Sequence, residues 1–582
     1  MANSRLQQLF NYLRPHWRMV SLGVVALLVV NYLGARIPRL IGDSIDRLSN
    51  DFDFSELSRF ALLLLLFSVL MWIFRMLSRL SIFGVGRQVE FLLKQKIFQH
   101  LLGIEPAYFA NNTSGDLINR ATSDVDNIRR LVGFALLSIV NVIFAYTLTL
   151  REMFPISVRL TLISIAVYPV MIITVQLFSG QLRDRQKVVQ EKLSDLSELI
   201  QEDMSGMALI RIYAQENQER QAFEIKNQRL LRANLKLAKI RNILFPVIEG
   251  ISYISLLILL WLGTNAIASG AITVGNLVAL ILLVERLVFP TALLGFTITA
   301  YQRGEVSIDR VEAIFQAQPK IKNVPHAIVL PKKAVRGKII ARHLTYTYPD
   351  SDKPALDDLN FTIAPGETVA IVGAIGSGKS TLANAIPRLL NIEAGQLFLD
   401  ERDITQLDLD ALRSAIAYVP QDSFLFSTSI ENNIRYGEPL VESPEIEYAA
   451  KQAQIHPEII NFPQQYKTLV GERGITLSGG QRQRTSLARA LLVDAPVLIL
   501  DDALSSVDNE TATEILNNLS PERERRSVIF ISHQLAAAAI CDRIMVMDKG
   551  KIVQDGTHEE LLQQPGTYQS LWQQHQLEEV LN

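Results

Sequence analysis

Apolar residues form long runs in the first 300 residues of the chain and only short runs after them. Six of the long runs approach the length at which a helix crosses a bilayer, about 20 mostly apolar residues. Buried helices of a large soluble domain are the alternative, but they would give shorter and more interrupted runs. The pattern therefore predicts transmembrane helices over Met19–Pro38, Phe60–Leu80, Leu131–Leu150, Leu160–Leu177, Ile243–Ala268 and Leu277–Ala300.

The connections between these spans alternate in length and charge. About 50 residues separate spans two and three, about 65 separate spans four and five, and the other connections are short. The short segment Asp43–Glu56 is acidic, whereas the long connections are rich in Lys and Arg, which mark the cytoplasmic side. We therefore expect the N-terminus, both long connections and everything after Ala300 in the cytoplasm. We also expect helical extensions that turn near 105–116 and 206–216, where they would reach a cytoplasmic domain.

Ionisable residues inside a span are costly, and Arg75, Glu249 and Glu285 are among those that fall inside the predicted spans. Glu285 and Arg286 are adjacent, so they lie about 100° apart on a helix and cannot share one face. Glu285 belongs to a substrate cavity, or to a buried structural pair, or lies near an interface, and the sequence leaves these open. Aromatic residues and a proline of the sixth span could line such a cavity or simply pack: Phe289, Pro290 and Phe296.

The second half of the chain has a different pattern. A polar stretch over 321–337 separates the apolar runs from short β-rich segments that alternate with helical ones, as in an α/β fold. The sequence thus predicts a membrane domain over 1–320, a linker over 321–337 and an α/β domain over 338–582.

One motif in the α/β domain has the form G-x-x-x-x-G-K-S and lies between a strand pattern and a helix pattern. In such a P-loop the glycines let backbone N–H groups cradle phosphate, Lys379 reaches the β- and γ-phosphates, and the Ser380 hydroxyl ligates Mg²⁺. We expect ATP and Mg²⁺ here. The expected nucleotide-binding residues are Gly373, Ala374, Gly376, Ser377, Gly378, Lys379, Ser380 and Thr381.

Two further motifs follow downstream. The apolar strand pattern beginning at Val497 ends in Asp501 and Asp502, and Asp501 suits the Mg²⁺ shell. Ser478, Gly479, Gly480 and Gln481 precede a helix pattern and can present N–H groups and a hydroxyl to phosphate. Because the P-loop already supplies one cradle, this second one suggests that a second polypeptide shares the site.

Composition excludes several classes of protein and of binding site. Hydrophobic residues make up 49% of the chain and charged residues 20%, which is too apolar for a purely soluble protein of 582 residues. A formal net charge of −2 gives no global field for nucleic acid. The single cysteine, Cys541, excludes an internal disulfide and a multi-thiol metal site.

Taken in order, these motifs resemble an ATP-binding cassette (ABC) transporter, with six spans followed by one cassette. The resemblance covers essentially the whole chain and implies two cassettes that dimerise head to tail, with ATP between one P-loop and the other cassette's Leu477–Gln481 signature. It also assigns Tyr348 to adenine stacking, Gln421 to Mg²⁺ and catalysis, and His533 to the γ-phosphate. Further matches are a loop residue that senses the membrane domain, Glu472, and a residue that contacts the second cassette, Asp508.

The chain departs from the family pattern at Asp502, where the family usually has the Glu that polarises the attacking water. Asp is one methylene shorter, about 1.5 Å less reach, and a misplacement of about 1 Å can cost about a hundredfold in rate. We expect this site to bind nucleotide and hydrolyse it slowly. An intact signature beside a weakened carboxylate resembles one half of the heterodimeric bacterial exporters, most closely the A half of the multidrug-resistance-like (Mdl-type) pair.

Several functions remain open from sequence. Export of an amphipathic drug or lipid from a bacterial inner membrane, with a second half-transporter as partner, is favoured over a slow homodimeric lipid flippase. An ATP-gated channel or a regulatory subunit is also compatible with Asp502. A soluble P-loop enzyme is disfavoured by the spans.

Overall fold

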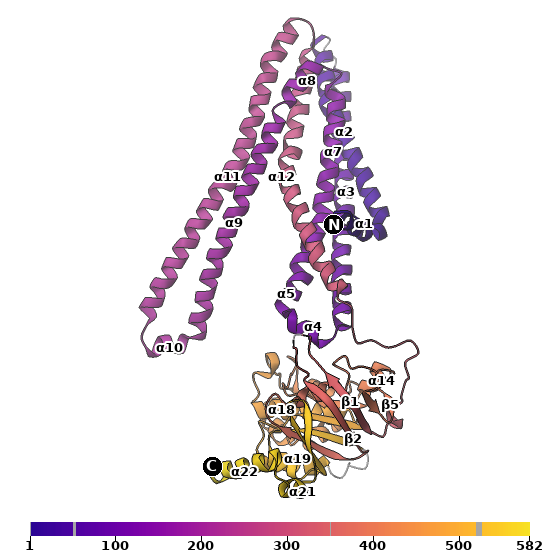
Figure 1. Cartoon of the computed structure of the whole chain (residues 1–582). Helices are drawn as coiled ribbons and strands as arrows, with labels where there is room; N and C mark the ends of the chain where they lie inside the picture. The colour runs from indigo at the N-terminus through magenta and orange to yellow at the C-terminus, as the bar shows by residue number, and fades with distance from the viewer. Residues whose placement is uncertain (1, 51–53, 350, 520–525, 582) are drawn as a thin grey trace. The chain divides into compact units, whose positions relative to one another are not determined.

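The computed structural model describes residues 2–50, 54–349, 351–519 and 526–581 (Figure 1). The chain divides into two compact units. We call the first, Met1–Gly103 with Asn112–Ala317, the membrane unit. The second, Ile104–Asn111 with Gln318–Asn582, is the cassette unit.

The membrane unit is helical throughout. Within the described residues, six helical stretches are long and apolar enough to cross a membrane, and each contains one of the predicted spans. Two π-helical turns, Arg120–Asp124 and Leu131–Ala135, join α5, α6 and α7 into one of these stretches. The helices are α1 (Ala2–Leu13), α2 (Trp17–Asn50), α3 (Phe54–Leu102), α5 (Ser114–Asn119), α6 (Val125–Arg130), α7 (Leu136–Met153), α8 (Val158–Ile165), α9 (Tyr168–Ser205), α10 (Met207–Ile212), α11 (Glu216–Ala268) and α12 (Val274–Gln316).

The helices run beyond the apolar stretches, as their uninterrupted patterns predict. Helix α3 continues to Leu102, and α9 and α11 run side by side with α10 joining their tips (Figure 1). The predicted turn near 206–216 holds the short helix α10. The turn near 105–116 likewise holds a short helix, α4 (Pro106–Asn111), because a proline fits the first turn of a helix, where its missing N–H has no partner to lose. Both tips are therefore more ordered than their turn-forming residues indicate.

The membrane unit has an apolar core with contributions from α7, α8, α9, α11 and α12, including the fully buried Met153, Met171 and Leu283. By contrast, the most apolar part of α3 is exposed, with Leu65 and Trp72 among its outward side chains. Exposed apolar surface of this extent suits contact with lipid or with another membrane helix.

The cassette unit is an α/β structure with two sheets. An antiparallel sheet has the order β2-β1-β4-β5, and a six-stranded sheet has the order β10-β9-β3-β8-β7-β6. In the larger sheet every pairing is parallel except that of β10 with β9. The strands are β1 (Ile339–Tyr346), β2 (Leu356–Ile363), β3 (Thr368–Gly373), β4 (Leu397–Leu399), β5 (Arg402–Asp403), β6 (Ile416–Val419), β7 (Val497–Asp501), β8 (Ser527–Ile531), β9 (Arg543–Asp548) and β10 (Lys551–Gly556).

Both faces of the six-stranded sheet are covered, so its central strands are continuous apolar runs. In β7, Val497 and Ile499 join one buried cluster, while Leu498 and Leu500 join the other, as the alternation of strand side chains requires. The α-helices of the cassette unit after β3 are α13 (Lys379–Ala385), α14 (Leu409–Ser414), α15 (Ile430–Arg435), α16 (Ser443–Gln452), α17 (His456–Asn461), α18 (Gly479–Leu492), α19 (Asn509–Leu519), α20 (Leu535–Ala539), α21 (His558–Gln563) and α22 (Thr567–Leu581). The predicted fold class, a helical membrane domain followed by an α/β cassette, is confirmed.

Candidate functional site

The strand order brings the sequence motifs to one edge of the six-stranded sheet. Strands β3, β8, β7 and β6 are parallel neighbours, so their carboxyl ends lie at the same edge. The P-loop follows β3 and His533 follows β8, while Asp501 ends β7 and Gln421 follows β6. Ligands of open parallel sheets bind at this edge. Residues that are up to 160 positions apart in the sequence therefore surround one site.

The P-loop backbone needs its glycines. Gly373, Gly376 and Gly378 have φ angles of 150°, 81° and 100°, which L side chains rarely adopt. A Cβ on Gly373 would also lie 2.1 Å from the Met547 carbonyl oxygen, and one on Gly378 would lie 2.4 Å from that of Ala355. The loop can therefore approach a ligand with backbone N–H groups alone.

The Lys379 side chain is buried and contacts the backbone of the P-loop. Its side chain is 7% exposed, and its ammonium donates hydrogen bonds of 2.9 Å to the carbonyl oxygens of Gly373 and Ala374. Burial lowers the pKa of Lys379, whereas the nearby carboxylates of Asp501 and Asp502 act in the opposite direction. A buried cation held beside backbone N–H groups is suited to phosphate.

Asp501 is buried at the end of β7 with two hydroxyl donors. Ser380 Oγ donates to Oδ1 of Asp501 across 3.0 Å, and the Tyr418 hydroxyl donates to Oδ2 across 3.2 Å. Burial raises the pKa of Asp501, and these two donors oppose the increase. One hydroxyl and one carboxylate oxygen side by side fit Mg²⁺, which takes only one or two protein ligands when phosphates and water complete its shell. No group of three metal-ligating His, Cys, Asp or Glu side chains occurs in the described part of the chain.

Asp502 leaves the strand in a left-handed conformation, with a φ angle of 51°. Its backbone N–H donates to the carbonyl oxygen of Ile531 across 2.8 Å, which ties it to the end of β8. Burial raises the pKa of the Asp502 carboxyl, and the opposing influences come from His533, Lys379 and Gln421. The structure thus brings the three residues expected to act in catalysis, Asp502, His533 and Gln421, to one place.

The signature motif begins a helix and is not the flexible loop that its Ser-Gly-Gly sequence alone suggests. Ser478 caps α18: its Oγ accepts from the Gln481 N–H, and the Gln481 side chain accepts from the Ser478 N–H. Such a reciprocal capping box fixes the first turn, which Gly479 and Gly480 occupy. A Cβ on Gly480 would lie 2.8 Å from the Ser506 carbonyl oxygen, so the helix start requires glycine there. Ser478 itself is exposed and lies at the positive end of a fourteen-residue helix.

The remaining predicted residues lie around these motifs. Tyr348 is 39% exposed, its ring stands edge-on to Tyr346 at 5.1 Å, and its hydroxyl lies 3.3 Å from Thr381 Oγ1. Asp508 is exposed and accepts hydrogen bonds at 2.8 and 2.9 Å from the N–H and hydroxyl of Thr511 at the start of α19. The N–H and hydroxyl of Thr511 both lower the pKa of Asp508.

Two contributors to the site are absent from the sequence-based set. Tyr418 lies on β6, three residues before Gln421, and its role depends on the pairing of β6 with β7. Gln483 is 6% exposed on α18; its Nε2 donates to Ser505 Oγ across 2.9 Å, and its Oε1 accepts from the Ser506 N–H at 2.9 Å. Gln483 therefore joins the signature helix to the segment that follows Asp502. A polar residue one turn inside an otherwise apolar helix face was the available signal.

Known proteins share this arrangement. Residues 20–291 match the ABC transporter transmembrane region and residues 356–505 match the ABC transporter family. The chain is 33% identical to the multidrug resistance-like ATP-binding protein MdlA of Escherichia coli, over 99% of the chain and 97% of that protein. It is 32% identical to the probable multidrug resistance ABC transporter ATP-binding/permease protein YheI of Bacillus subtilis, over 99% and 98%. It is also 32% identical to the ATP-dependent lipid A-core flippase of Syntrophus aciditrophicus, over 98% and 94%.

The fold has a solved counterpart. A bacterial Atm1-family ABC exporter with ATP bound superposes with a TM-score of 0.76 at 24% identity, covering 97% of this chain and 99% of that one. That similarity concerns the fold. The family matches and the near full-length relatives establish more: this chain is a multi-pass membrane protein of the ABC transporter family, a half-size exporter with an ATP-binding cassette.

Proposed function

We propose that this chain is one half of a dimeric, ATP-driven exporter of hydrophobic or amphipathic compounds, drugs or lipids. The observation that carries the proposal is the union of six membrane-crossing stretches and one ABC cassette in a single chain. Relatives named for multidrug resistance and for lipid A-core flipping support this substrate range. ATP binding would close two cassettes and switch the membrane halves from inward- to outward-facing. The Lys- and Arg-rich long connections favour a cytoplasmic N-terminus and cassette, and the bacterial relatives support a location in the inner membrane.

The geometry of the cassette supports the following nucleotide roles. The P-loop and Lys379 would hold the phosphates, Tyr348 would stack on adenine, and Ser380, Asp501 and Gln421 would hold Mg²⁺. Mg²⁺ would neutralise phosphate charge when bound. The exposed start of α18 would face a second cassette, whose nucleotide would accept hydrogen bonds from Ser478, Gly479, Gly480 and Gln481. Asp508 would contact the same second cassette.

Asp502 distinguishes this half from its family. Burial raises the pKa of its carboxyl, and a raised pKa by itself improves a general base. The pKa of Asp502 therefore does not limit it as a general base. The limit is the shorter side chain, which brings the carboxylate less far toward the attacking water. Its backbone is fixed to Ile531 at the end of β8, so the chain cannot easily advance to make up the missing methylene. We infer a site that holds ATP for long periods and hydrolyses it slowly.

This chain combines a nucleotide site expected to hydrolyse ATP slowly with an intact signature motif, and this combination favours a heterodimer. The signature of this chain would complete the partner's site, where the partner supplies the usual glutamate. A slow homodimeric lipid flippase is the second candidate, and an ATP-gated channel or regulatory subunit is the third, because Asp502 is compatible with each. Substrate accumulation separates the third from the others, since a channel cannot concentrate a solute.

The experiment is to reconstitute the full chain, alone and with the half-transporter encoded beside it, into inside-out vesicles. Uptake of a fluorescent amphipathic dye against its gradient, with ATP and only in the pair, is the expected result. Uptake by the chain alone would favour the homodimer. Equilibration without accumulation in either preparation would favour the channel and overturn the exporter.

A further inference from the structure

Arginines surround a cavity inside the membrane unit. Helices α2, α3, α7 and α12 enclose about 260 Å³, and the largest polar side chains in the lining are Arg75, Arg79 and Arg286. Two amides, Asn31 and Asn141, and two hydroxyls, Ser78 and Ser138, complete the polar part, and no carboxylate belongs to the lining. Glu285, which the sequence left as a possible cavity residue, does not line this cavity, whereas its neighbour Arg286 does. Phe289 and Pro290 of the same helix line it as well.

Arg286 is held in place by neutral groups only. Its NH2 donates to the backbone oxygen of Asn31 at 3.0 Å and to the Asn31 amide oxygen at 3.1 Å. The Asn31 amide in turn donates to Oδ1 of Asn141 at 3.0 Å, which links α2 to α7. The Nε of Arg286 is shielded and has no hydrogen-bond partner in the described residues. The guanidinium is therefore fixed, while part of its donor capacity is unused.

The backbone of α2 makes room for this guanidinium. A Cβ added to Gly34 would lie 1.7 Å from NH1 of Arg286 and 2.5 Å from its Cζ. Any side chain at Gly34 would consequently displace Arg286 from its position. A substitution at Gly34 would therefore displace the charged guanidinium of Arg286 while leaving the arginine itself in the chain.

The position of Arg286 makes its charge expensive. It lies twelve residues after Val274, the first residue of α12, which is about 18 Å along the helix. The hydrocarbon core is about 30 Å thick, so Arg286 falls near its middle. Ionisable side chains at such depth pair with one another or with backbone carbonyls. Arg286 has the backbone carbonyl of Asn31, but in the described ranges Arg75, Arg79 and Arg286 form no ion pair with an acid.

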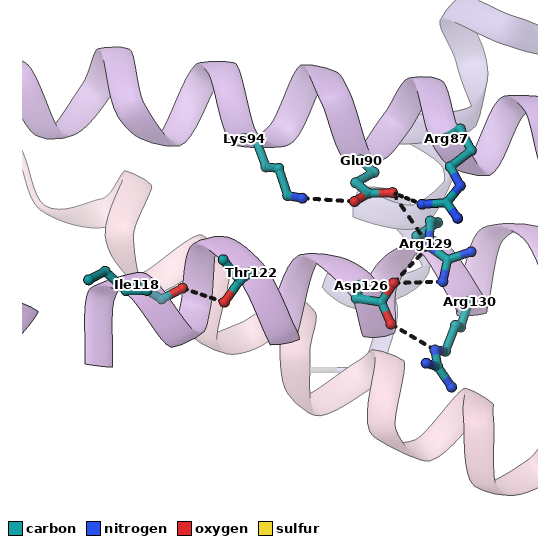
Figure 2. A network of polar contacts seen from close by, with 8 residues as sticks. All are labelled: Arg87, Glu90, Lys94, Ile118, Thr122, Asp126, Arg129 and Arg130. Atoms are coloured by element: carbon teal, nitrogen blue, oxygen red, sulfur yellow. Dashed lines mark hydrogen bonds and ion pairs between the residues drawn. The ribbon is translucent and has the colours of Figure 1, made fainter. Parts of the chain in front are cut away.

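A larger cavity of about 640 Å³ adjoins this one, because Leu293 lines both. Its apolar lining includes Phe134, Leu182 and Phe296. Two of its arginines already have acidic partners, as Figure 2 shows. The contacts are Arg129 to Asp126 at 2.6 Å, Arg129 to Glu90 at 3.4 Å and Arg130 to Asp126 at 2.8 Å. The others, Arg183, Arg241 and Arg303, are exposed side chains.

We propose that the cavity around Arg286 binds the anionic group of an amphiphile, a phosphate, sulfate or carboxylate, whose apolar part occupies the adjoining cavity. A guanidinium fork held at a fixed angle matches such an anion through paired hydrogen bonds. The combined volume suits a drug-sized or single-tailed ligand. The proposal rests on the export function, since it specifies the substrate class of that transporter.

The test measures equilibrium binding, so that it does not depend on ATP turnover. The full chain with its partner half, in neutral phosphatidylcholine nanodiscs, is titrated with dodecyl phosphate, dodecyltrimethylammonium and inorganic phosphate. We expect dodecyl phosphate to bind at least about tenfold more tightly than the cationic amphiphile, because charge-assisted hydrogen bonds are worth that much. If inorganic phosphate bound as tightly as dodecyl phosphate, the cavity would be a site for free anions, and the proposal of an amphiphilic ligand would be overturned.

Variants locate the site. Arg286→Gln and Gly34→Ala should each weaken dodecyl phosphate binding by about tenfold, while Glu285→Gln, on the neighbouring residue, should leave it unchanged. If Arg286→Gln lowers the yield of folded protein, Arg75→Gln, at an exposed position of the same cavity, provides a second measurement of dodecyl phosphate binding. An effect confined to Arg183→Gln, Arg241→Gln or Arg303→Gln would move the anion to the larger cavity and overturn the proposal. Anion binding without ATP-driven uptake would instead contradict the export function and leave this site standing.

Discussion

The Ser380 hydroxyl donates a hydrogen bond to Oδ1 of Asp501 across 3.0 Å and joins the start of α13 to the end of β7. The two oxygens come from motifs 121 positions apart in the sequence, and the parallel pairings of β3 with β8 and of β8 with β7 bring them together. Their separation allows both to ligate one Mg²⁺ that also binds phosphate.

Replacing Ser380 by alanine tests this arrangement. We expect Ser380→Ala to reduce the Mg²⁺-dependent gain in ATP affinity by about tenfold, because one hydrogen bond to a charged group is lost. ATP binding in EDTA should change little, since Lys379 and the loop N–H groups remain. Calorimetric titration with and without Mg²⁺ measures both, and Ser414→Ala on α14 is a matched control. An unaltered Mg²⁺ dependence in Ser380→Ala would remove Ser380 from the metal shell.

The pH at which Mg²⁺-dependent binding is lost should depend on the hydrogen bond from the Tyr418 hydroxyl to Asp501. Burial raises the pKa of Asp501, and the Tyr418 donor lowers it, so Tyr418→Phe should raise it further. Protonated Asp501 cannot ligate the metal; Mg²⁺-dependent binding is therefore present above this pKa and lost as the pH falls through it. In Tyr418→Phe the loss should begin at a higher pH than in the unaltered chain. Titrations from pH 4 to 8 decide this, and a shift toward lower pH would contradict it.

The buried amide of Gln483 should be needed for stability and for turnover. Gln483→Leu removes the hydrogen bonds to Ser505 Oγ and from the Ser506 N–H, each worth about 0.5–1.5 kcal/mol of unfolding free energy. It also frees the signature helix from the segment after Asp502, so ATP turnover of the pair should fall. Thermal unfolding of the full chain and ATPase assays measure the two effects. Gln563→Leu, at an exposed position on α21, is the control; equal effects of both variants would show that Gln483 has no special part.

Gly480 should be irreplaceable for the partner's site. The Cβ of Gly480→Ala would meet the Ser506 carbonyl oxygen at 2.8 Å and push the first turn of α18 aside. A shift of about 1 Å can cost about a hundredfold in rate, so turnover of the pair should drop strongly. Nucleotide binding to this chain's own P-loop should persist. Gly180→Ala, where a Cβ meets nothing within 4 Å, is the matched control, and normal turnover in Gly480→Ala would argue against the signature's role.

Patterns that depend on one element were readable from the sequence. The six spans follow from apolar length alone, and the P-loop follows from spacing that backbone geometry dictates, as the φ angle of 100° at Gly378 illustrates. The start of α18 was only partly readable, because Ser-Gly-Gly suits both a loop and a capped first turn until the Gln481 side chain chooses the turn.

Relationships between elements were not readable. Whether Glu285 lined a cavity depended on the rotation of α12 against α2. In the structure Arg286 packs against Gly34 and lines the cavity, and Glu285 is not part of the lining. Tyr418 and Gln483 likewise acquire their roles from strand order and from the chain segment opposite them. Periodicity along one helix or strand carries no information about such partners.

The claim that Asp502 makes this half a slow ATP site is tested most directly by the ATP turnover of the purified full chain alone, with and without Asp502→Ala. We predict low turnover that Asp502→Ala leaves almost unchanged, and a large increase when the partner half is added. Robust turnover by the chain alone that Asp502→Ala abolishes would contradict the account, because Asp502 would then be a competent base in a homodimer.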